Sequence, residues 1–279
     1  MKSHRNTTPL GGLLALALLL ATVLLAGGCT GGPGVEQLYA RATQAAYACK
    51  YDEALSLTER CLDQQPDHVK ALILHSYCRY RLLTPEQLRR DSSTVVTHVE
   101  KAARLAPQDF MAQYFHGWML FEAGQYGRAL EPLERAYELR AQCPDRDDSV
   151  LVMLSMCCVN QNLARGRTYL QALRRFRGFE RSALVYNALG VLNAKQQDYQ
   201  GALGSFMEAL GRDPNHAVVL TNVAVLYDER LQRPDESMRY YSRAIAARQA
   251  MRDSTRQDEM RRRLKQLVTE ARRPANSRP

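Results

Sequence analysis

The histidines and cysteines are the residues of this chain whose types and spacing could do chemistry. Beyond residue 30 the histidines are widely spaced, at His68, His75, His98, His116 and His216. No two of them stand four apart on a helix as metal ligands would, and neither a CxxC nor an HExxH sequence occurs. The glycines form no phosphate-binding loop, and the adjacent Cys157 and Cys158 are interpreted as part of an apolar helix face rather than as a redox pair. We therefore expect no enzyme, no metal site and no cofactor.

A second chemical feature lies at the amino terminus and ends in Cys29. Lys2 and Arg5 precede an apolar run over residues 10–26, which small residues follow. A basic start, an apolar run of this length and small residues before a break are typical of an export signal, here residues 1–28. The run is short for a membrane span of about 20 residues, and an uncleaved anchor is the alternative.

Residues 25–29, with the sequence LAGGC, resemble the lipobox of bacterial lipoproteins. In that family small residues precede a cysteine that is acylated and becomes the first residue, although the usual leucine stands one place further from the cysteine here. The resemblance implies lipidation of Cys29, which would anchor the chain stably because several acyl chains are attached, and a tether over residues 29–34. Thr30 replaces the aspartate that retains some lipoproteins at the inner membrane, so the periplasmic face of the outer membrane is favoured. An ordinary signal peptide with a coincidental cysteine is the alternative.

The other cysteines are expected to be structural. They are Cys49, Cys61, Cys78, Cys143, Cys157 and Cys158. An exported protein can form disulfides, but this spacing matches no disulfide or zinc framework. Cys61 and Cys78 stand where small core residues are wanted and are expected to be buried thiols. A bridge from Cys143 to Cys157 or Cys158 is the alternative for the later cysteines.

The elements that carry these residues follow one recurring pattern. It reads Tyr51-x-x-Ala54 with Pro66, Tyr126-x-x-Ala129 with Ala136, and Tyr199-x-x-Ala202 with Ala209 and Pro214. The copies lie in frames of 34 residues, a period typical of stacked helical hairpins. Small residues at fixed places allow the two helices of a hairpin to approach closely, and the proline ends the second helix.

These frames resemble tetratricopeptide repeats, which place small residues at their eighth, twentieth and twenty-seventh positions. The resemblance implies an all-α fold, a right-handed solenoid of about six helical hairpins over residues 35–248 with a C-terminal capping helix. The expected hairpins cover residues 35–68, 69–109, 110–142, 149–182, 183–216 and 217–248. The fourth is predicted from periodicity alone, and the sixth has one residue inserted near Pro234. The second contains an insertion over residues 84–90, where Thr84, Pro85 and Gln87 predict a capped helical turn.

The C-terminal segment, residues 249–273, is predicted to form the capping helix. An apolar stripe would cover the last hairpin, and its members are Met260, Leu264, Leu267 and Val268. The chain has a net charge of +9, and basic residues gather in this segment: Arg261, Arg262, Arg263, Lys265, Arg272 and Arg273. They are interpreted as the solvated face of the helix, with an anionic lipid or cell-wall surface as the alternative partner. Nucleic acid is not expected for an exported chain, and residues 274–279 are expected to be disordered.

The resemblance also implies a partner-binding groove, because the first helix of each tetratricopeptide repeat lines the concave face. In the second and third repeats the groove positions are mostly aromatic or apolar: Lys70, Ile73, Tyr77, Tyr80, Arg81, Met111, Tyr114, Trp118 and Phe121. In the fifth and sixth repeats they are polar: Asn187, Lys195, Thr221, Asp228 and Glu229. Exposed aromatic residues are typical of binding hot spots, and Lys70 with Arg81 would hold a carboxylate. Packing of the aromatic residues against the insertion or the fourth repeat is the alternative.

The sequence therefore predicts a lipid-anchored scaffold or adaptor that binds proteins or peptides of the bacterial cell envelope. By resemblance, anchored repeat proteins of this kind serve the assembly of secretion, pilus or polysaccharide-export machines, although fold alone does not fix function. The carboxylate-clamp subtype, which binds chaperone tails, is rejected because Lys70 and Asn187 stand too far apart in the sequence. A cell-wall or glycan-binding module is the alternative function, and an enzyme with an unfamiliar site is the second alternative.

Overall fold

The computed structural model describes residues 32–142, 148–176, 178–180, 182–251 and 256–272. The export signal, Cys29, Cys143 and residues 274–279 lie outside the described residues, so the expectations for them stay predictions. Within the described ranges the chain is helical and has no strand. No helix in these ranges is both long enough and apolar enough to span a bilayer. The chain divides into two compact units, residues 1–157 and 158–279.

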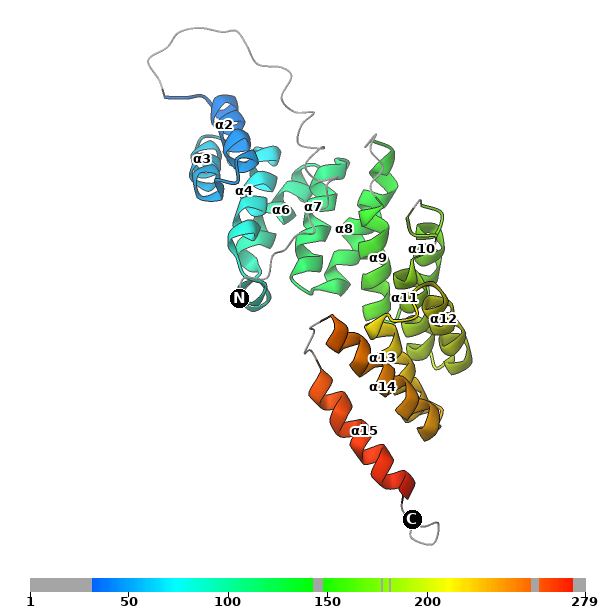
Figure 1. Ribbon diagram of the computed structural model, residues 1–279. Helices are drawn as coiled ribbons and strands as arrows, with labels where there is room; N and C mark the ends of the chain where they lie inside the picture. Colours follow the sequence, from blue (N-terminus) through cyan, green and yellow to red (C-terminus); the bar gives the residue numbers. More distant parts are fainter. Residues whose placement is uncertain (1–31, 143–147, 177, 181, 252–255, 273–279) are drawn as a thin grey trace. The chain divides into compact units, whose positions relative to one another are not determined.

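The first unit contains the first three expected hairpins and the start of the fourth (Figure 1). Its helices are α2 (Val35–Tyr47), α3 (Tyr51–Gln64), α4 (Val69–Leu82), α5 (Pro85–Arg90), α6 (Ser93–Leu105), α7 (Phe110–Glu122), α8 (Tyr126–Leu139), the short 3-10 turn η1 (Arg140–Gln142) and α9 (Ser149–Asn160), which ends in the second unit. Helix α2 packs against α3, α4 against α6, and α7 against α8. The predicted hairpins are therefore confirmed in this unit.

The insertion in the second hairpin forms α5 with a complete capping box. Thr84 Oγ1 accepts a hydrogen bond from the Gln87 amide at 3.2 Å, and Gln87 Oε1 accepts one from the Thr84 amide at 2.8 Å. Pro85 occupies the start of the helix, where its missing amide proton costs nothing. The predicted capped turn is confirmed, and Leu88 is the residue that it buries.

The hairpins close tightly where the sequence places small residues. The eighth position is buried in the first, second, third, fifth and sixth repeats: Ala42, Ser76, Gly117, Gly190 and Ala224. A Cβ atom at Gly117 would lie 2.6 Å from Leu133 Cγ of the facing helix, and one at Gly190 would overlap the ring of Phe206. Cys61 and Cys78 are also fully buried free thiols, as expected.

The second unit contains the later hairpins and the capping helix. Its helices are α10 (Gly166–Leu173), α11 (Ala183–Lys195), α12 (Tyr199–Arg212), α13 (Ala217–Val225), the π-helical turn η2 (Leu226–Arg230), α14 (Pro234–Ala250) and α15 (Gln257–Arg272). Helix α11 packs against α12 and α13 against α14, while α10 packs against α11. Helix α10 is shorter than the other second helices, which agrees with the weak pattern in this part of the sequence.

Helix α15 covers the last hairpin as the sequence predicts. Met260 and Leu267 are buried, Leu264 is partly buried, and all three belong to the core of the second unit. Figure 1 shows α15 alongside α14, and the two helices are in contact. Because α14 continues to Ala250 and α15 begins at Gln257, the capping helix starts later than residue 249.

The residue inserted in the sixth hairpin is accommodated by η2. In three repeats the first helix ends at the same position with a left-handed residue, at Cys49, Gly124 and Gln197, with φ of 58°, 74° and 64°. In the sixth repeat the left-handed residue is Gln232, with φ of 54°, one position later. A π-helical turn takes up an extra residue without ending the helix. The insertion therefore lies before Gln232, within the first helix of the hairpin.

Candidate functional site

The aromatic residues predicted for the groove meet where α4 and α7 lie next to each other. Trp118 of α7 is at the centre, with its ring centroid 6.1 Å from that of Tyr77 and 5.2 Å from that of Tyr80, both on α4. On its own helix it contacts Tyr114 and Phe115, at 6.3 Å and 5.4 Å. These separations fall in the range of favourable aromatic pairs. We call Tyr77, Tyr80, Tyr114, Phe115 and Trp118 the aromatic cluster.

One carboxylate fixes the orientation of two rings of the cluster. Glu122, at the end of α7, accepts a hydrogen bond from the Tyr80 hydroxyl at 2.8 Å and one from Trp118 Nε1 at 3.3 Å. Each carboxylate oxygen serves one ring. Because the polar edges of both rings are bound, their apolar faces are held in place before any partner arrives. Preorganisation of this kind reduces the ordering cost of binding.

Arg81 adds a positive charge at the edge of the cluster. Its guanidinium carbon lies 4.9 Å from the ring centroid of Tyr51 and 5.8 Å from that of Tyr77. It also donates a hydrogen bond to the Tyr77 hydroxyl at 2.9 Å. Tyr51 and Tyr77 themselves stand edge to face at 6.3 Å. The guanidinium is thus held by two aromatic rings while its side chain remains exposed.

The nine predicted groove residues differ in how far they are open to a partner. Ile73, Tyr80 and Tyr114 are buried, Tyr77, Met111, Trp118 and Phe121 are half-buried, and Lys70 and Arg81 are exposed. The Tyr114 hydroxyl accepts a hydrogen bond from Ser149 Oγ of α9 at 3.2 Å. The alternative that the aromatic residues pack against the fourth repeat therefore applies to Tyr114. The half-buried and exposed residues stay candidates for partner contact.

The structure places Lys70 and Arg81 at opposite ends of one helix, and their joint binding of one carboxylate stays a prediction. Both residues belong to α4, and their separation of eleven positions corresponds to a rise of about 16 Å along an α-helix. Arg81, which lies beside the aromatic cluster, is the cation available to an anionic group bound there.

The polar groove positions of the second unit are largely occupied within the protein. Lys195 Nζ donates to the carbonyl oxygens of Val159 and Asn160 at 2.8 Å and 3.1 Å, so it caps the end of α9. Thr221 and Asp228 are buried beneath α15. Their coverage by the capping helix could not be read from the repeat pattern, which places them on an open face.

Asp228 forms an ion pair with Arg263, a residue that the sequence analysis placed on the solvated face of the capping helix. Arg263 of α15 donates from Nη2 to Asp228 Oδ1 and from Nε to Asp228 Oδ2, both at 2.7 Å. The Tyr241 hydroxyl lies 3.5 Å from the same carboxylate. The hydrogen bonds to Asp228 raise the pKa of Arg263. Arg263 is therefore held by an ion pair to the last hairpin and is partly exposed, whereas Arg261, Arg262 and Lys265 are exposed as expected.

Among the residues that the structure describes, no group of three or more His, Cys, Asp or Glu side chains could hold a metal ion. His75 and His98 are in contact, with ring centroids 4.5 Å apart and ring planes tilted by 41°. The Thr58 hydroxyl contacts His75 Nδ1 at 3.2 Å. Burial and the neighbouring His98 lower the pKa of His75 to about 4, which describes a neutral core histidine.

Stacked helical hairpins, close small-residue contacts and a capping helix define a helical-repeat solenoid. Within this class, the family model described as tetratricopeptide repeat matches residues 96–146 and 160–217. Residues 96–146 and 160–217 are therefore tetratricopeptide-repeat sequence, and the fold is that of tetratricopeptide-repeat solenoids.

Solved structures of tetratricopeptide-repeat proteins resemble this fold. PilF of Pseudomonas aeruginosa has a TM-score of 0.53 and 14% identity, over 82% of this chain and 97% of that one. PilW, described as a widely conserved type IV pilus biogenesis factor, has a TM-score of 0.57 and 12% identity, over 81% and 97%. The C-terminal part of a repeat protein from Cytophaga hutchinsonii has a TM-score of 0.57 and 18% identity, over 84% and 89%. At these identities the likeness concerns the fold. A search of curated proteins gives no match.

Proposed function

We propose that this protein is a scaffold in the bacterial cell envelope whose aromatic cluster binds a segment of a partner protein. The observation that carries the proposal is the pair of half-buried rings of Tyr77 and Trp118 on two neighbouring first helices, with the Trp118 ring oriented by Glu122. Trp, Tyr and Arg are the residues that dominate binding energy at protein interfaces. Here all three types occur within one surface of the first unit.

The surface favours a particular partner chemistry. The half-buried faces of Tyr77, Trp118 and Phe121 would take one or two apolar side chains. Arg81, held by Tyr51 and Tyr77, would take a carboxylate next to them. The partner segment is therefore apolar with an acidic residue at one end.

The envelope location is proposed from the amino terminus. The lipobox-like sequence ending at Cys29 supports a lipid anchor, with the outer membrane as the favoured site. The fold likeness to PilF and to PilW, a pilus biogenesis factor, supports a role in assembling a pilus, a secretion machine or a polysaccharide-export machine.

Site-specific photo-crosslinking in cells tests the binding surface. A photo-activatable phenylalanine analogue replaces Trp118, and the control replaces Glu131, which is exposed on the second helix of the same hairpin. We expect one envelope protein to crosslink from position 118 and not from position 131. Equal crosslinking from both positions, or only crosslinks between copies of this chain, would contradict the proposal. Binding of the purified chain to isolated cell wall, lost with Arg261 and Arg262 changed to Glu, would instead favour the glycan-binding alternative.

The anchor has a separate test. Cys29→Ser is expected to abolish acylation and to release the protein from the membrane fraction, as measured by metabolic labelling with an alkyne fatty acid and by fractionation. Cys49→Ser, which changes an exposed cysteine of the first repeat, is the matched control and is expected to leave both unchanged. Labelling that persists in Cys29→Ser would rule out this site.

A further inference from the structure

The segment around α10, in the second unit, is rich in arginine. Between Asp148 and Glu180 the sequence contains five arginines, no lysine and no acidic residue. Four of the five belong to the described structure and are exposed: Arg165, Arg167, Arg174 and Arg175. Because a guanidinium group is planar and carries several donors, arginine binds phosphate groups in a bidentate way. This composition therefore indicates a partner that carries phosphates.

Helix α10 gathers the charge along one side. Its buried side is formed by small and apolar residues: Gly166, Leu170 and Leu173. Arg167, Gln171 and Arg174 follow one another at spacings of four and three, so they lie along another side of the helix, where all three are exposed. Arg175 is the next residue and is also exposed. We call Arg167, Arg174 and Arg175 the arginine face.

Two guanidinium groups of the arginine face are held by α11. Arg167 Nη2 donates a hydrogen bond to Asn193 Oδ1 at 2.8 Å. The guanidinium carbon of Arg174 lies 5.0 Å from the ring centroid of Tyr186, and that of Arg212, at the end of α12, lies 3.7 Å from the same centroid. Two positive charges at one ring repel each other, so an anion bound next to them would be stabilised.

The acidic residues nearby leave the arginine face unpaired. Glu208 forms an ion pair with Arg212 at 2.7 Å, and α11 contains no acidic residue. Glu180 lies in the connection to α11, and among the described residues no ion pair joins it to the arginine face. The three charges of the face are therefore available to a partner.

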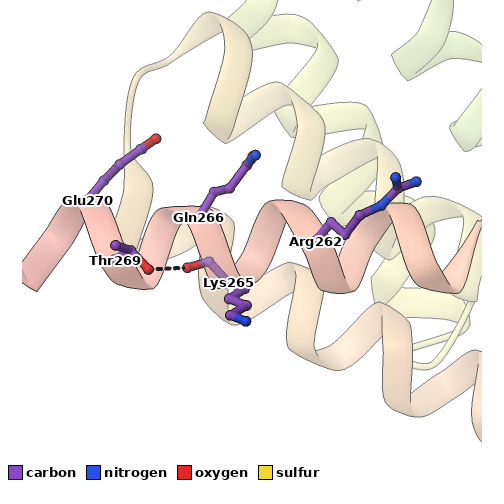
Figure 2. A pocket seen from close by; sticks show the side chains of 5 residues that line it. All are labelled: Arg262, Lys265, Gln266, Thr269 and Glu270. Atoms are coloured by element: carbon purple, nitrogen blue, oxygen red, sulfur yellow. Dashed lines mark hydrogen bonds between the residues drawn. The ribbon is translucent and has the colours of Figure 1, made fainter.

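The capping helix is the other basic segment, but it contains carboxylates of its own. They are Asp258, Glu259 and Glu270. Figure 2 shows Glu270 on the same helix as Arg262 and Lys265, and its carboxylate lies 3.7 Å from Arg263 Nη1. The excess of positive charge is therefore smaller on α15 than around α10.

Apolar side chains follow the arginine face along the chain. Phe176 and Phe179 are half-buried in the turns after α10, and Leu184, near the start of α11, is 61% exposed. A lipid surface suits both kinds of residue, because arginine pairs with headgroup phosphates while apolar side chains enter the boundary beneath them. A hydrated polyanion offers no apolar layer to the leucine. The combination therefore favours a membrane over a nucleic acid or a polysaccharide.

We propose that the arginine face holds the second unit against an anionic membrane surface. Its guanidinium groups donate to the phosphodiesters of lipid headgroups, and Leu184 enters the apolar boundary beside them. The inference rests on the proposed location in the envelope, where a bilayer is within reach of an anchored chain. It adds a second membrane contact, made by α10 and not by the first helices that carry the aromatic cluster.

Quenching of a single tryptophan by brominated lipids tests the proposal. Gln171→Trp, combined with Trp118→Phe, places the only tryptophan between Arg167 and Arg174. The full chain, purified as cells process it, is mixed with brominated vesicles of phosphatidylcholine, either alone or with phosphatidylglycerol in equal parts. We expect quenching by the anionic vesicles and little by the neutral ones, and added salt should reduce it. Gln266→Trp in the same background is the control on the exposed side of α15, and it should show little quenching with either.

Loss of two arginines measures their contribution. Arg174→Gln with Arg175→Gln should weaken the anionic contact by about 25-fold, because each cation near such a surface contributes about fivefold. Quenching at position 171 should then fall to the level seen with neutral vesicles. Arg261→Gln with Arg262→Gln removes the same charge from α15 and should leave this quenching unchanged. Circular dichroism checks that each variant stays folded.

Three outcomes would overturn the inference: equal quenching by neutral and anionic vesicles, stronger quenching at position 266 than at 171, or equal loss in the two arginine pairs. Binding of heparin without quenching by anionic vesicles would assign the face to a polysaccharide instead. Flotation of the unsubstituted chain with neutral vesicles reports the lipid anchor separately. A chain that floats but shows no anionic quenching at position 171 keeps the anchor and refutes the role of the arginine face, so the two failures are distinguishable.

Discussion

At the scale of single residues, His75 and His98 make the stability of the first unit depend on pH. Their ring centroids lie 4.5 Å apart with the planes tilted, and His98 Nδ1 is buried without a hydrogen-bond partner in the described structure. Burial lowers the pKa of both, to about 4 for His75, with His98 and Arg79 adding to the effect on His75 and Lys101 to that on His98. Both imidazoles are therefore neutral in the folded protein near pH 7.

We expect the folded state to lose stability as the pH falls from about 6.5 towards 4. In this window the unfolded chain binds a proton at His75, because its pKa there is near the ordinary value, while the folded chain does not. Each such histidine removes up to about 1.4 kcal/mol of unfolding free energy per pH unit. Urea unfolding at pH 7.5, 6.0 and 5.0 measures this loss.

His75→Asn provides the control for that series, because an asparagine can keep the contact with Thr58 without titrating. The pH dependence should be shallower in this variant. An identical slope in the variant and the parent protein would show that His75 is not the titrating group.

At the scale of elements, the closeness of paired helices is set by glycines that admit no side chain. Gly190 of α11 and Gly204 of α12 belong to the same hairpin but have opposite surroundings. A Cβ atom at Gly190 would overlap the Phe206 ring, whereas nothing lies within 4 Å of one at Gly204. The same substitution should therefore have opposite effects at the two positions.

Gly190→Ala is expected to lower the unfolding free energy by about 1–3 kcal/mol, because the helices must separate or Phe206 must move. Gly204→Ala is expected to raise it by about 0.5–1 kcal/mol, since alanine is the better helix former at an exposed position. Chemical denaturation followed by circular dichroism compares the two. Similar effects of both substitutions would mean that the hairpin does not close as described.

At the scale of the whole molecule, the array depends on its end. Repeat proteins gain stability from each repeat and from contacts between neighbours, so their ends need a cover. Helix α15 supplies this cover with Met260 and Leu267, and the Asp228–Arg263 ion pair attaches it to the last hairpin. Asp228 is only 6% exposed, which makes the loss of its partner costly.

Arg263→Ala is expected to destabilise the second unit by about 2 kcal/mol. This is less than a fully buried pair would lose, because the Arg263 side chain is 38% exposed and water screens part of the interaction.

Circular dichroism should show earlier loss of helix on heating. The fluorescence of Trp118, the only tryptophan, should shift less because it reports on the first unit. Arg261→Ala, at an exposed pair with Asp258, should have little effect, and a loss equal to that of Arg263→Ala would contradict this account.

The sequence by itself determined the repeat period, the hairpins, the capping box at Thr84 and Gln87, and the apolar stripe of α15. These features depend on neighbours along the chain, through helix periodicity, capping hydrogen bonds and the sizes of residues at fixed positions. Only the tertiary structure decided which aromatic residues are buried, where the extra residue of the sixth hairpin is accommodated, and that Arg263 pairs with Asp228. The physical reason is that these outcomes depend on contacts between helices, and a charge 35 positions away in the sequence becomes a partner only when packing brings it within reach.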